Sequence, residues 1–181
     1  MVKSNRGRVV GFLGACTASI LLAACGTSAS SPTTTGATTT VVPALATCTT
    51  AVLSASLAND QGAAGTFSYV LTLTNRGATT CRTEGYPGVS LINAMGHLIG
   101  IPATRVPKRI SSITLAPSQR AHATIFITDS GAVCDHATVA NALRVYPPDQ
   151  TTSLVIPVAY MDYCVGYTAQ SFSVTPLSPS S

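Results

Sequence analysis

Residues 66–75 read TFSYVLTLTN, and apolar and polar side chains alternate through most of this stretch. Successive side chains of a strand point to opposite faces of a sheet, so a period of two predicts a strand with one face in a core. The stretch RAHATIFITD at 120–129 repeats the pattern. The side chains expected to face the core are Phe67, Tyr69, Leu71, Leu73, Ala121, Ala123, Ile125 and Ile127.

Shorter strand candidates surround these two stretches, separated by turns rich in Gly, Pro and Asn. This pattern predicts an all-β, immunoglobulin-like antiparallel β-sandwich of about seven to eight strands. The likeness is architectural, because no Trp is present to pack on a disulfide as in antibody domains. A helical turn is expected only in ATVANALR at 137–144. The other expected strands are 51–57, 89–93, 112–115, 142–146, 153–158 and 171–175.

The N-terminus has the zones of a bacterial secretory signal. Basic residues at 3, 6 and 8 precede an uncharged apolar run at 9–22, which is shorter than the ~20 residues a membrane-spanning helix needs. The run ends in Leu22-Ala23-Ala24-Cys25, which resembles a bacterial lipobox. We therefore expect residues 1–24 to be removed as a signal peptide. Cys25 would then carry fatty acyl chains such as palmitate and anchor the protein in the cell membrane. An ordinary signal peptide cut nearby is the alternative.

A tether and one domain are expected after the signal. Residues 25–44 comprise the lipidated Cys and a tether rich in Ser and Thr, which cannot bury enough apolar surface to fold. Residues 45–181 form the β-sandwich domain. Removal of residues 1–24 takes three of the ten Lys and Arg residues and leaves seven against six acidic residues. The mature chain is therefore close to neutral, and no basic motif indicates nucleic-acid binding.

Four cysteines remain after Cys16 and Cys25 are set apart. An even number in an exported domain predicts two disulfides, and a zinc site is disfavoured because no two of the four are close in sequence. Four cysteines allow three pairings, and the sequence does not choose among them. We favour the pairing that joins neighbouring segments, which is Cys48–Cys81 and Cys134–Cys164.

The stretch NRGATTCRTEGYPGVSLINAMGHLIG at 75–100 and the stretch LAPSQRAHATI at 115–125 carry a family resemblance. Their pattern resembles the actinobacterial domain-of-unknown-function family 4232. The family usually has glycine where this chain has Ser118. The resemblance implies exported or lipid-anchored β-sandwiches and carries no catalytic residues to this chain.

The motif Gly85-Tyr86-Pro87-Gly88 has two interpretations. As a structural motif, it is a corner in which Tyr86 is buried beside the Cys48–Cys81 bridge; as a binding motif, it exposes Tyr86 to a ligand. We favour the corner. Gly77 and Gly88 are expected at turn positions with positive φ.

Few residues of the sequence suggest a binding or catalytic role. Arg105, Lys108 and Arg109 form a basic cluster that is either a solvated loop or a contact for an anionic lipid, a glycan or an acidic partner protein. Asp135 and His136 could be combined with a serine into a hydrolase triad, but we interpret that combination as coincidence. We therefore predict no enzyme and no cofactor. No metal site is predicted either. Side chains that suit copper nevertheless occur at Met95, His97, His122, His136 and Met161.

These features together predict a cell-envelope lipoprotein. Its sandwich is expected to act as a non-catalytic binding module outside the cytoplasmic membrane, with an envelope protein or a glycan as partner. The alternative is a tethered carrier of a small ligand or of copper.

Overall fold

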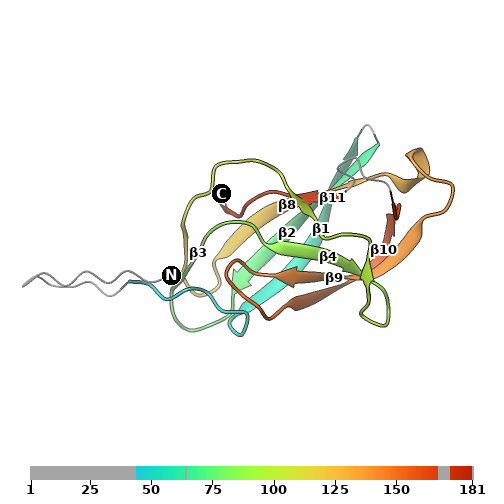
Figure 1. Cartoon of the computed structure of the whole chain (residues 1–181). Coiled ribbons are helices and arrows are strands. Elements are labelled where there is room, and N and C mark those ends of the chain that lie inside the picture. Colours follow the sequence, from blue (N-terminus) through green and yellow to red (C-terminus); the bar gives the residue numbers. More distant parts are fainter. Residues whose placement is uncertain (1–43, 64, 167–171, 181) are drawn as a thin grey trace, which may run out of the picture. The chain divides into compact units, whose positions relative to one another are not determined.

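The computed structural model describes residues 44–63, 65–166 and 172–180 (Figure 1). The expected signal peptide, Cys25 and all of the tether before residue 44 lie outside the described residues. The described chain is built from strands and one 3₁₀ turn, η1 (Ser130–Ala132). The strands are β1 (Leu53–Ala63), β2 (Thr66–Asn75), β3 (Cys81–Thr83), β4 (Gly88–Ile92), β5 (Leu98–Ile99), β6 (Thr104–Arg105), β7 (Ile113–Leu115), β8 (Arg120–Thr128), β9 (Thr138–Tyr146), β10 (Leu154–Tyr163), β11 (Phe172–Val174) and β12 (Ser178–Pro179).

Two main sheets form the sandwich (Figure 1). The first has the order β1-β2-β8-β11-β6, and β12 also pairs with β8. The second has the order β10-β9-β4-β5, and β3 and β7 form a separate small ribbon. Neighbouring strands are antiparallel except for β6 and β11, which are parallel. The predicted immunoglobulin-like β-sandwich is confirmed, with one parallel pair at an edge that we did not expect.

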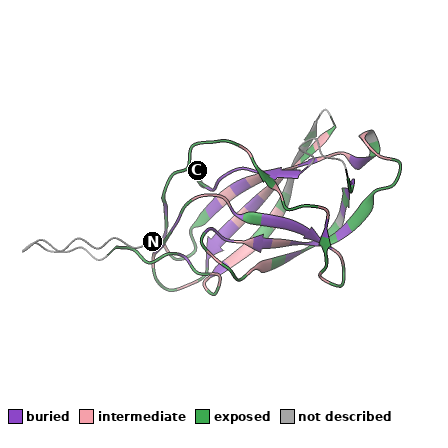
Figure 2. Ribbon diagram, in the orientation of Figure 1, coloured by how far each residue is buried: buried purple, intermediate pink, exposed green. Residues whose placement is uncertain are grey.

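The core lies between the two sheets and consists of the inward side chains of both (Figure 2). Leu71, Leu73 and Ile125 are fully buried, as the alternation of β2 and β8 predicts. Phe67 departs from this pattern because 39% of it is exposed. It lies toward the hairpin end of β2, where the core opens.

The expected helical turn at 137–144 is wrong, because residues 138–144 belong to β9. Its residues pair with β4 on one side and β10 on the other. Alternate burial of Ala140 and Ala142 on a central strand outweighs the helical preference of a short Ala- and Leu-containing segment.

The two favoured disulfides are confirmed: Cys48 is bonded to Cys81, and Cys134 to Cys164. The first joins the segment before β1 to β3, and the second joins the segment after η1 to the end of β10. Each closes a loop of about 30 residues, which the chain-entropy model associates with roughly 3.5–4 kcal/mol.

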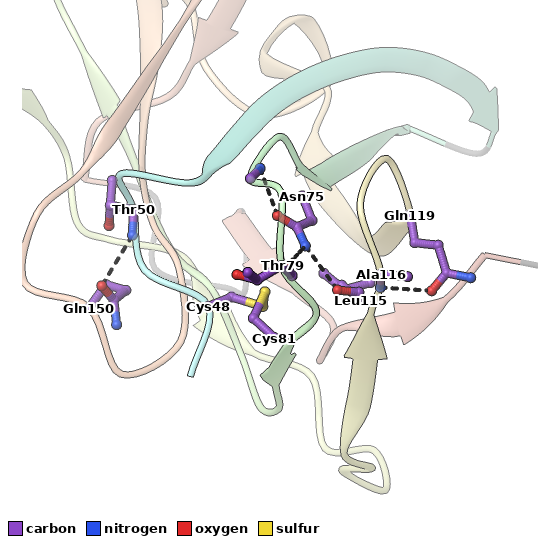
Figure 3. Close-up of a disulfide and its surroundings, with 10 residues drawn as sticks. Cys48, Thr50, Asn75, Thr79, Cys81, Leu115, Ala116, Gln119 and Gln150 are labelled. Atoms are coloured by element: carbon purple, nitrogen blue, oxygen red, sulfur yellow. Dashed lines mark hydrogen bonds between the residues drawn. A yellow bond between two sulfur atoms is a disulfide. The ribbon is translucent and has the colours of Figure 1, made fainter. Parts of the chain in front are cut away.

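Near Cys48–Cys81, the buried side chain of Asn75 organises three backbone segments (Figure 3). Its amide nitrogen donates to the carbonyls of Thr79 and Leu115 at 2.8 and 2.9 Å, and its amide oxygen accepts from the Gly77 N–H at 2.9 Å. The Asn75 backbone also bonds to the turn between β7 and β8, through Ser118 and Gln119. Asn75 therefore fixes the end of β2 against both neighbouring turns.

Positive φ values occur at glycines other than the two we expected. Neither Gly77 nor Gly88 has a positive φ; Gly85 in the same motif does, at 100°. Ser118 has a φ of 67°, a left-handed conformation that suits glycine. This is the position where the resemblance leads one to expect glycine.

We predict that Asn75→Ala lowers the free energy of unfolding by about 3 kcal/mol, because two carbonyls and one N–H lose their partner in or near the core. Urea unfolding of both proteins measures the difference. Asn141→Ala, at an exposed position in β9, is the control and should change stability by less than about 0.5 kcal/mol. Equal effects of the two changes would contradict the role given to Asn75.

We predict that Ser118→Gly raises the free energy of unfolding by roughly 0.5 kcal/mol, because relief of the left-handed strain exceeds the added entropy of the unfolded chain. Ser112→Gly is the matched control, since Ser112 is also exposed but has no positive φ. It should lower stability by about 0.4–1 kcal/mol, because glycine adds entropy to the unfolded chain. Thermal unfolding at one protein concentration compares the three proteins, and a lower midpoint for Ser118→Gly would refute the expectation.

Candidate functional site

The cations singled out in the sequence lie on one exposed segment, residues 104–110, which we call the basic loop. It begins with β6, and the side chains of Arg105, Lys108 and Arg109 are exposed. Val106 is half-buried, and its N–H donates to the carbonyl of Val174 next to β6. The loop is thus tied to the first sheet while its charged side chains face solvent.

Tyr86 holds the basic loop in place. Its hydroxyl donates to the Val106 carbonyl at 2.8 Å and accepts from the Lys108 N–H at 3.2 Å. The guanidinium carbon of Arg105 lies 5.3 Å from the centre of the Tyr86 ring, within reach of a cation–π interaction. Tyr86 is half-buried and makes these contacts with the loop, so its structural role differs from the burial beside the disulfide that we expected.

The residues around Tyr86 explain its position. Gly85 adopts a positive φ, and its carbonyl accepts the N–H of Leu177, which is buried after β11. Pro87 is buried, and its ring biases the backbone of Tyr86 toward an extended conformation. The motif Gly85–Gly88 is therefore a corner, and the segment it orders is the basic loop.

The cations of the basic loop have no carboxylate partner among the described residues. The ion pair that the described residues do contain lies away from the loop. It joins the exposed side chains of Arg82 in β3 and Glu84 just after it, at 3.5 Å. Ile110 adds an exposed apolar side chain to the loop, with half of it accessible. The loop thus presents fixed positive charge beside apolar surface, which suits an anionic partner.

The residues considered for copper lie on separate elements. Met95 and His97 are in the turn between β4 and β5, and His122 is in β8, where its Nδ1 lies 2.9 Å from the Thr72 hydroxyl. His136 follows η1, and Met161 is buried in β10. Across residues 44–63, 65–166 and 172–180, no three His, Cys, Asp or Glu side chains gather in a way that could hold a metal ion.

A cavity that the sequence analysis did not predict lies at the opposite end of β2 from Asn75. It has a volume of about 250 Å³ and is lined by residues of β2, β8 and β10, among them Asp129 and Asp162. The alternation of β8 is the sequence signal that could have predicted this cavity. Asp129 continues the inward-facing series Ala123, Ile125, Ile127. A carboxylate at a core-facing position indicates that the core is open there.

The described residues contain no helix that is long and apolar enough to cross a membrane. A family model described as "Domain of unknown function (DUF4232)" matches residues 48–178. Neither the comparison with curated proteins nor the comparison with solved structures gave a match.

We predict that Tyr86→Phe loosens the basic loop. The Val106 carbonyl and the Lys108 N–H lose their shared partner, so the amide of Lys108 should exchange hydrogen faster, and the free energy of unfolding should fall by about 1 kcal/mol. Hydrogen exchange followed by NMR measures the first effect. Tyr146→Phe, at another half-buried tyrosine, is the control and should leave the Lys108 amide unchanged. Unchanged exchange in Tyr86→Phe would contradict the anchoring role.

Proposed function

We propose that this chain, which belongs to the DUF4232 family through residues 48–178, is a cell-envelope lipoprotein whose sandwich binds an acidic partner protein through the basic loop. The observation that carries the proposal is the set of three cations within five residues, held by Tyr86 and lacking a carboxylate partner in the described structure. No catalytic step is assigned to this surface.

The location is proposed from the N-terminal sequence. A lipobox-like Leu22-Ala23-Ala24-Cys25 follows the apolar run, and the Ser- and Thr-rich segment after it separates the anchor from the folded domain. Disulfides persist in oxidising compartments outside the cytoplasm, so the two bridges of the domain support an exported location.

A protein partner fits the loop better than a uniformly charged membrane surface. Two of the three cations are arginines, whose planar guanidinium suits carboxylates in a fixed geometry. Ile110 is half exposed beside them, and apolar side chains next to arginine are typical of the core of protein interfaces. Tyr86 pre-orders the backbone, which lowers the entropy cost of binding.

The alternative of a small-ligand carrier draws support from the 250 Å³ cavity rather than from the histidines. The copper form of this alternative rests on the sequence alone, since no three His, Cys, Asp or Glu side chains among the described residues gather in a way that could hold a metal ion.

We predict that replacing Arg105, Lys108 and Arg109 together by alanine abolishes a discrete crosslinked adduct of the anchored protein in intact cells. The replaced side chains are exposed, so the fold should be retained. The control replaces Arg76, Arg82 and Arg120 by alanine, which removes the same charge from exposed positions elsewhere. It should keep the adduct, and raised salt should weaken the adduct of the natural protein.

Three outcomes would overturn parts of this proposal. Equal loss of the adduct in both triple variants would show a general charge effect, and no adduct at all would remove the protein partner. Crosslinks to lipid or glycan alone would assign the loop to an envelope surface other than a protein. A mature chain without acyl mass on Cys25 would contradict the anchor whatever the loop does.

A further inference from the structure

The cavity at the hairpin end of the sandwich, which we call the end cavity, has a mixed lining. Phe67 and Tyr69 come from β2, Ile127 and Asp129 from β8 and the residue after it, and Met161 and Asp162 from β10. Ile127 and Met161 are 2% and 3% exposed, so they form an apolar floor. The end cavity thus combines an apolar floor with two carboxylates.

The end cavity is an opening of the core between the two sheets. Phe67 and Tyr69 continue the inward series of Leu71 and Leu73, which are fully buried. Toward the hairpin end the side chains of this series become more exposed to solvent: Tyr69 is half-buried, and Phe67 is 39% exposed. Aromatic side chains in core-facing positions therefore line a space that no described side chain fills.

Phe67 is held in this position by its cross-strand partner. Gly62 pairs with Phe67, and a methyl group built on Gly62 would lie 3.0 Å from the Phe67 ring. The ring therefore packs directly over the glycine backbone. This packing fixes one aromatic wall of the end cavity without blocking it.

The electrostatics of the end cavity favour a cation. Asp162 is exposed and Asp129 half-buried, and no Lys or Arg is among the described residues that line the cavity. The Asp129 carboxylate accepts only the Gly131 N–H among the hydrogen bonds described for it. Burial, and then the nearby charge of Asp162, raise the pKa of Tyr69, so its phenol stays neutral and the charge at the cavity comes from the two carboxylates.

We propose that the end cavity binds an organic ammonium group, as carried by a lysine side chain or by a small amine. Aromatic rings attract such cations through their faces, the carboxylates neutralise the charge, and the apolar floor accepts methylene or methyl groups. Hard metal ions, in contrast, prefer oxygen ligands and gain nothing from aromatic rings and an apolar floor, so this lining suits an organic cation better. A volume of about 250 Å³ is below the range of drug-sized pockets, so it suits a single group.

The proposed site is separate from the basic loop and has the opposite charge. Figure 1 shows the β1–β2 hairpin and the segment after β8 at the end of the domain away from residues 44–50, where the described chain begins. The inference does not depend on the basic loop.

Methionine methyl groups provide the test. The sequence has three methionines: Met161 lines the end cavity, and Met95 lies at another hollow with Arg144, on the second sheet. In the full chain labelled with ¹³C-methyl methionine, Nα-acetyl-lysine methylamide and tetramethylammonium are added separately. We expect a saturable shift of the Met161 signal with at least one of them and no shift of Met95. Neopentanol, a neutral compound of similar shape to tetramethylammonium, should cause no saturable shift.

Two variants assign the interaction. Asp162→Asn should weaken ammonium binding by about five-fold, and Phe67→Leu by a similar factor, because each removes one attraction to the cation. Asp135→Asn, which removes an exposed carboxylate outside the cavity lining, is the matched control and should bind as the natural protein does.

The results separate the proposal from its rivals. Stronger binding of the lysine amide points to a protein or peptide source, and stronger binding of tetramethylammonium points to a methylated small amine; both support the site. No Met161 shift up to about 10 mM of either cation, an equal shift with neopentanol, or equal weakening by Asp135→Asn would overturn it. The crosslinking result for the basic loop has no bearing on these outcomes.

Discussion

The buried amide of Asn75 is the contact on which the arrangement of this sandwich depends. It joins the turn after β2 to the end of β7, and the adjacent backbone joins the turn before β8. Strands β2 and β8 are neighbours over nine residue pairs, so their register follows from how these turns are held at one end. A buried polar side chain with all its groups bonded specifies one arrangement, because any shift leaves donors and acceptors unpaired in the core.

The Cys48–Cys81 bridge lies beside this amide and closes the same end of the domain (Figure 3). The other end is built differently: the second disulfide ties η1 to β10, but the inner faces of the sheets remain open to solvent around Phe67. One end of the domain is thus fixed by hydrogen bonds and a disulfide close to the core. At the other end a space remains between the two sheets. This difference explains why the cavity lies where it does.

The sequence predicted the parts of the fold that depend on the alternation of apolar side chains and on the number of cysteines. The alternation of β8 gave its buried face, and the even number of cysteines gave two disulfides, whose favoured pairing the structure confirms. Features that depend on contacts distant in sequence were not predictable. The local sequence of β9 suggests a helical turn, but pairing with β4 and β10 makes it a strand. The hydrogen-bond partners of Tyr86 lie 20 and 22 residues away in the chain. The basic cluster was visible in the sequence, whereas the end cavity needed three strands to be placed.

Strand β8 carries a further consequence for how the domain reaches its final structure. One edge of β8 pairs with β2, and the other pairs with β11 and β12, which come after every other strand in the chain. Leu177, between them, is buried and bonds to the Gly85 corner. The first sheet therefore stays incomplete until residues 172–179 have left the ribosome.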